Sequence, residues 1–253
     1  MILLVRLLPL LVGLFEVAAF WEQSRASSSY PWIVLVGWAA VPLAALIIGW
    51  KRVSWQEVVN KMAPTFVTLA CLGFGLLLVE GTWQFWLLAS LAGLIAFISL
   101  ELLFLLAYDP AAYPVQGLSR VNVGYVPIAV WYAASTSSGL LMFLHIDIIW
   151  HIALMSVLGA ILFRTTGHPD ATREQDRLWT FLGVLVGFEV GALGVFLPLG
   201  MQAQGLIAAV MFAAALRARR YLYQPVPGKR LAYAEVASAV VVFLLALVTS
   251  KWI

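Results

Sequence analysis

Charge and cysteine are both scarce in this sequence, and each scarcity excludes a class of protein. Only 11% of the residues are charged, 63% are hydrophobic, and the mean hydropathy is +0.98. A soluble protein of 253 residues could not bury so much apolar surface. The single cysteine, Cys71, excludes a disulfide within the chain, a cysteine-based metal site and a CxxC redox motif.

Long apolar runs occupy most of the chain and predict its fold. Runs of about 17 or more residues recur along the whole length, and each could cross roughly 30 Å of hydrocarbon as a helix. We therefore expect an all-α, polytopic membrane helix bundle that forms a single integral membrane domain over residues 1–253, with residues 51–62 and 109–122 as loops. We expect about nine transmembrane helices, over residues 2–21, 32–50, 63–80, 85–108, 123–143, 145–163, 179–199, 201–216 and 231–249.

The basic residues predict how these helices are oriented. Twelve of the fifteen Lys and Arg residues lie in the connections after the second, fourth, sixth and eighth expected spans. The positive-inside rule makes these connections cytoplasmic, with the N-terminus cytoplasmic and the C-terminus outside. The net charge of +3 is then a topology signal and indicates no nucleic acid partner. The expected location is the cell (inner) membrane, multi-pass, with the lipid bilayer as partner; other membrane subunits are a further candidate.

Ionisable side chains within apolar spans are costly in a bilayer and usually pair or line a cavity, so they are the candidates for a functional site. Asp147 and His151 are four residues apart on one helical face, where they could share a proton or bind one metal ion. Glu16, His145 and Glu189 fall at a similar expected depth. We therefore expect an outward-facing polar pocket, although His145 and Asp147 could instead cap a helix while His151 satisfies a polar neighbour.

The run DIIWH, residues 147–151, resembles an HxxWH-like run of the alkaline ceramidase and progestin-receptor-type membrane hydrolases. The resemblance covers five residues and implies a zinc-dependent hydrolase. Asp147 stands where that family has histidine, and the chain contains no SxxxH, the family's source of another zinc ligand. We assign no family on this run.

Glycines at every fourth position mark the seventh expected span. Gly183, Gly187 and Gly191 form a ridge that lets another helix approach closely. Glu189 lies about 160° around the helix from Gly187 and so faces a different neighbour. We expect this helix to be central, packed on its glycine side and lining a cavity on its carboxylate side.

Three classes of function follow from these patterns. The hydroxyl-bearing run at residues 135–138 has no GxSxG nucleophile motif, and no complete catalytic or cofactor motif occurs elsewhere, so no cofactor is identified. A non-enzymatic membrane subunit or scaffold of a larger assembly is favoured. The alternatives are a small ion- or proton-coupled transporter that uses outer-half carboxylates, and an intramembrane metal-dependent hydrolase centred on Asp147 and His151.

Overall fold

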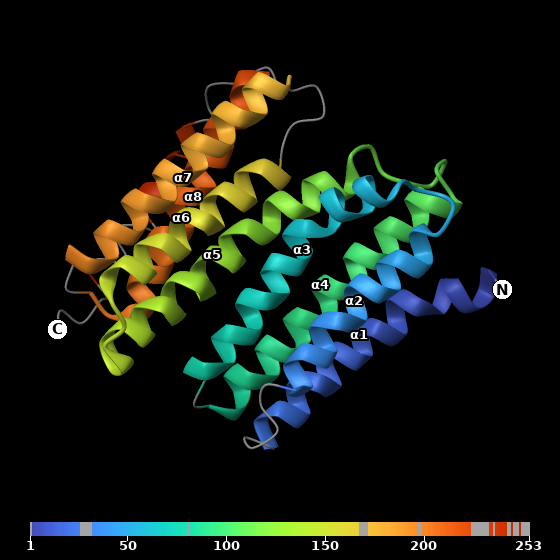
Figure 1. The fold of residues 1–253 in the computed structure, drawn as a ribbon, viewed down its shortest axis with the longest axis horizontal. Coiled ribbons are helices and arrows are strands. Elements are labelled where there is room, and N and C mark those ends of the chain that lie inside the picture. Colours follow the sequence, from blue (N-terminus) through green and yellow to red (C-terminus); the bar gives the residue numbers. More distant parts are fainter. Residues whose placement is uncertain are drawn as a thin grey trace. The chain divides into compact units, whose positions relative to one another are not determined.

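The structure, a computed structural model, describes residues 2–25, 32–79, 81–166, 172–196 and 199–223, together with 233–234, 236–241, 244 and 248. Within this part of the chain the fold is all-helical, as expected (Figure 1). The helices are α1 (Ile2–Arg25), α2 (Trp32–Gly49), α3 (Trp55–Gly75), the short 3-10 helix η2 (Leu76–Leu78), α4 (Thr82–Tyr108), α5 (Gly117–Leu144), α6 (Ile148–Thr165), α7 (Arg173–Phe196) and α8 (Met201–Tyr223).

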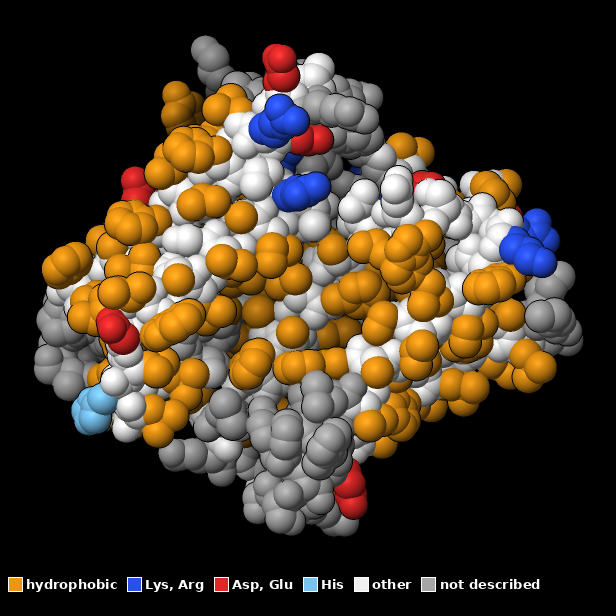
Figure 2. Space-filling view, viewed as in Figure 1, with side chains coloured by type: hydrophobic (Ala, Val, Ile, Leu, Met, Phe, Trp, Pro, Cys, Tyr) orange, Lys and Arg blue, Asp and Glu red, His pale blue; other side chains and the backbone are white. Residues whose placement is uncertain are grey.

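Seven of the eight described α-helices, all except α2, are long and apolar enough to cross a membrane. The second helix contributes a shorter apolar helical run, Val36–Gly49. Hydrophobic side chains are spread over the visible surface of the helices, and charged side chains are few on it (Figure 2). These features support a polytopic membrane protein. The ninth expected span, 231–249, is described only in part, at residues 233–234, 236–241, 244 and 248, so the count of nine stays a prediction.

Two expected loops are partly helical. Ser54 caps α3, because its hydroxyl accepts a hydrogen bond from the Glu57 backbone N–H at 3.2 Å, so the helix begins eight residues before the expected span. Lys61 pairs with Glu57 one turn earlier at 2.6 Å. Likewise α5 begins at Gly117, inside the stretch expected to be a loop. In both places a polar first turn extends an apolar helix beyond its hydrophobic run.

The chain divides into two compact units, residues 1–125 and 126–253. In the first unit α1 and α4 approach closely where Gly13 faces Gly93. A Cβ on Gly93 would lie 2.6 Å from the Gly13 carbonyl oxygen, closer than side chains tolerate. The two backbones can therefore come together only because neither position has a side chain.

A buried polar network joins α3, α4 and the start of α5 in this unit. The Thr65 hydroxyl donates to Ser99 Oγ at 3.0 Å, and Ser99 in turn donates to the Tyr125 hydroxyl at 3.3 Å. Asn122 Nδ2 donates to the Lys61 carbonyl at 2.6 Å. These side chains satisfy one another away from water, which is the usual condition for polar groups inside a helix bundle.

The second unit depends on close packing of α6 against α7. Gly159 of α6 faces Gly183, and Gly187 faces the backbone of Met155 and Ser156; in each place a Cβ would collide with main-chain atoms. The expected role of the glycine ridge is thus confirmed. The expectation that this helix is central is wrong, because the face of α7 turned away from α6 is exposed over much of its length.

This contact makes a stability prediction. Gly187→Leu should destabilise the fold by roughly 1–3 kcal/mol or more, because the larger side chain must push two backbones apart. Gly124→Leu is the matched control, since Gly124 is a helical glycine whose Cβ position has no atom within 4 Å apart from the backbone of its own helix. Recovery of monodisperse protein from detergent and the midpoint of thermal unfolding measure the effect. Equal behaviour of the two variants would contradict the packing.

Candidate functional site

The second unit contains a small cavity between α5, α6, α7 and α8. Its volume is about 20 Å³. Most of the lining is apolar, and the polar side chains in it are Ser138, His151 and Gln204. A space of this size accommodates one water molecule but not a drug-sized ligand.

His151 reaches the cavity because α7 has no side chains in its way. The imidazole is 2% exposed and lies in the first turn of α6, opposite Gly191 and Gly194. A Cβ on Gly194 would stand 3.0 Å from His151 Nε2. Nδ1 makes no hydrogen bond of normal geometry with the described residues, although the Gly191 backbone lies within reach of the ring.

The other two polar side chains come from neighbouring helices. Gln204, in the first turn of α8, is oriented by its amide, which donates to the Leu199 carbonyl at 3.0 Å. Ser138 on α5 is buried, and its Oγ has no hydrogen-bond partner among the described residues. A single water placed between the imidazole of His151 and the hydroxyl of Ser138 would satisfy two groups that have no partner among the described residues.

The hydroxyl-bearing run that includes Ser138 is buried throughout. Ser137 donates to the Ala134 carbonyl at 3.2 Å, and Ser135 packs directly against Gly205 of α8. Ser135 and Thr136, like Ser138, have no partner within the described part of the chain. The small residues thus allow α5 and α8 to approach each other closely.

The structure separates the residues that the sequence grouped. Asp147 is the N-cap of α6, where its carboxylate accepts the Ile149 backbone N–H at 3.1 Å, and its side chain is exposed. His145, three residues before the helix, is also exposed and has a φ of 51°. Neither residue lines the cavity. Of the five site residues proposed from the sequence, Glu16, His145, Asp147, His151 and Glu189, His151 is the one in its lining.

The two glutamates have opposite environments. Glu189 is exposed on the side of α7 that faces away from the glycine ridge. Glu16, in the first unit, is 0% exposed, and neither carboxylate oxygen has a donor among the described residues. Gly37 of α2 lies opposite it, and a Cβ there would be 3.3 Å from Glu16 Oε2.

The described residues contain no group of three or more His, Cys, Asp or Glu side chains that could hold a metal ion. A metal bound by Asp147 and His151 therefore stays a prediction of the sequence. No protein-family model, curated protein or solved structure matches the chain.

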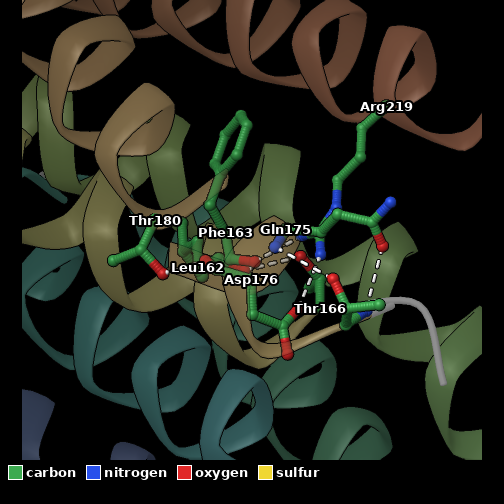
Figure 3. Close-up of polar contacts among 8 residues, drawn as sticks. Leu162, Phe163, Thr166, Gln175, Asp176, Thr180 and Arg219 are labelled. Carbon is green, nitrogen blue, oxygen red and sulfur yellow. Dashed lines mark hydrogen bonds and ion pairs between the residues drawn. The ribbon is translucent and has the colours of Figure 1, made fainter. Parts of the chain in front are cut away.

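A buried arginine is the residue that the sequence did not single out. Arg219 of α8 is 3% exposed and donates to the carbonyl of Phe163 in the last turn of α6 (Figure 3). Its guanidinium also lies 3.4 Å from Asp176 Oδ1 and 5.2 Å from the centre of the Trp179 ring, both on α7. Phe163 has one of the carbonyls that a helix end leaves unpaired, and a cation is favoured there.

Arg219 should therefore be essential for stability. Arg219→Met keeps the apolar stem but removes the donor, so the buried Phe163 carbonyl and Asp176 lose their partner; we expect a loss of roughly 2–4 kcal/mol. Arg177→Met on the exposed surface of α7 is the control and should change stability by less than about 0.5 kcal/mol. Thermal unfolding in detergent compares the two. An Arg219→Met variant as stable as the parent would show that the contacts of Arg219 with Phe163 and Asp176 contribute nothing to stability.

Glu16 should behave in the opposite way. Because no described donor satisfies its carboxylate, Glu16→Leu should leave the stability unchanged or raise it by roughly 1 kcal/mol. Glu101→Leu is the contrasting variant, since Glu101 pairs with Arg6 at 2.6 Å. The same unfolding measurement applies. A loss above about 2 kcal/mol for Glu16→Leu would mean that the carboxylate has a partner, such as a bound water or ion.

Proposed function

We propose that this chain is a non-enzymatic membrane subunit or scaffold of a larger assembly. The observation that carries the proposal is the exposed carboxylate of Glu189 within an apolar span. Gly187 packs against Met155 and Gly191 against Ile152, so Glu189 lies level with residues 153–154 of α6. That level is about 5 Å from the middle of α6, well within the hydrocarbon.

A carboxylate at this depth needs a polar partner. Ionisable groups near the centre of a bilayer cost roughly 2.5 kcal/mol or more, and they usually face a bundle interior or a water-filled cavity. Glu189 does neither within its own unit, and it makes no hydrogen bond or ion pair with any described residue. A neighbouring subunit that covers this side of α7 would supply what the lipid cannot.

The proposal is tested by the size of the protein extracted from its own membrane. In a mild detergent the chain should migrate as a complex larger than its own 27.7 kDa plus detergent. Glu189→Gln should shift it toward the single-chain size, whereas Glu174→Gln, an exposed acidic residue in the first turn of α7, should not. A wild-type chain that is monomeric in every mild detergent would overturn the proposal.

The proposed subunit has nine spans with the N-terminus cytoplasmic and the C-terminus outside, on the support of the loop charges. In a Cys71→Ser background, cysteines at His145 and Lys251 should react with an impermeant maleimide from one side of the membrane. A cysteine at Ala111, an exposed position between α4 and α5, should react from the other. Labelling of Lys251→Cys from the Ala111 side would exclude a ninth span; Lys251 itself lies outside the described residues.

The transporter alternative draws support from Glu16, a wholly buried carboxylate without a described donor. Such a group could exchange a proton or cation if a path opened to it. Reconstituted vesicles that showed ion or proton flux lost in Glu16→Gln, with unchanged folding, would favour this class over the subunit.

A further inference from the structure

We infer that the Glu189 side of α7 docks a transmembrane helix from a different protein, and that this helix carries a Lys or Arg side chain at the depth of Glu189. The inference rests on the proposed function and deepens it by naming the chemistry of the partner. Its basis is the surface around Glu189 and the distribution of cations in this chain.

The surface is a continuous stripe along one side of the helix. At 100° per residue, five apolar residues lie within about 40° of Glu189 around the helix axis; Leu182 is half-buried, and the other four form the surface described here. All four are exposed: Leu178 by 56%, Leu185 by 40%, Leu193 by 38% and Phe196 by 80%. We call these four residues, together with Glu189, the Glu189 stripe. A stripe of this width and length fits a single helix, with one polar position near its centre.

The stripe faces away from the contact that holds α7 in its unit. The glycine ridge lies on the opposite side, in contact with α6. The docking surface is thus supported from behind by a backbone-to-backbone contact, and covering it requires no rearrangement of α6. The apolar residues alone would be equally stable in contact with lipid. Glu189 is therefore the feature that indicates a contact with another protein.

The described residues place no cation against Glu189. Apart from Arg25, the last residue of α1, every Lys and Arg in the described helices lies near the helix ends on the other side of the membrane if successive spans alternate in direction. The apolar stretch at 231–249 contains no Lys or Arg either. A second copy at the same depth would bring only another carboxylate, and these facts point to a different protein.

A Lys or Arg side chain on the partner helix would compensate the charge of Glu189 and have its own charge compensated in return. A basic side chain within a span has the same need for a counter-charge as Glu189, and the pair would form a charge-assisted hydrogen bond in a water-poor setting. A hydroxyl or amide could also donate, but it would leave the carboxylate charge uncompensated. The experiment below separates these cases.

The test is photocrosslinking of the full-length chain in its own membrane. p-Benzoylphenylalanine replaces Leu185 on the stripe or, as the control, Leu154 on the outward side of α6 near the same depth; Leu154 is 49% exposed. We expect a protein adduct from Leu185 and not from Leu154, with the crosslinked peptide lying in an apolar span that contains Lys or Arg. Glu189→Gln should reduce the adduct roughly fivefold or more, and exchanging the two charges between the partners should restore it.

Each other outcome overturns the inference in a distinguishable way. An adduct with a second copy, with residues 231–249, or with a span lacking Lys and Arg would exclude the cationic partner while the subunit proposal stands. Protein adducts from Leu154 alone would move the interface to another face. Adducts with lipid alone, at both positions and at further exposed sites on each unit, would overturn the inference and the proposed function together.

Discussion

The contact between the backbones of α6 and α7 is the constraint on which the second unit depends. With Gly159 opposite Gly183, and Gly187 opposite Met155, main-chain atoms meet where side chains would normally stand. In a bilayer this is an effective way to join helices, because lipid removes the hydrophobic drive and leaves close packing to hold them. The same contact sets the rotation of α7. It directs Gly194 toward His151 and leaves the carboxylate of Glu189 on the opposite side.

The polar groups of the second unit divide according to this geometry. At one end Arg219 joins the last turn of α6 to α7, and its charge is matched by Asp176 and by a helix-end carbonyl. At the other end His151 and Ser138 border a space large enough for one water. Both arrangements are internal and small, and neither resembles a substrate pocket in size. Among the described residues, the remaining ionisable group within an apolar span of this unit is Glu189, and its carboxylate is exposed on the outer side of α7.

Much of the fold was predictable, because the length of an apolar run is a local property of the sequence. The helix starts at Trp55 and Gly117 were missed, since a polar first turn has no apolar signal and Ser54 is recognisable only as a possible cap. Contacts between residues of different helices were harder to predict from the sequence. Asp147 and His151 share one helical face in a regular helix, but Asp147 lies before the helix and caps it. The burial of Arg219 depends on where α8 meets α6, which composition does not reveal.

Exposure has a different meaning for Glu189 than it would in a soluble protein. An exposed glutamate in water needs no explanation, and a buried one, such as Glu16, would attract attention. In a bilayer the solvent is hydrocarbon, so the outward-facing carboxylate is the costly one. The apolar neighbours of Glu189 on the stripe cannot compensate it, and no described side chain pairs with it. A wholly apolar face is equally stable against lipid and against protein, so it does not indicate what covers it. The carboxylate of Glu189 needs a polar partner, and it is therefore the more informative feature of the surface.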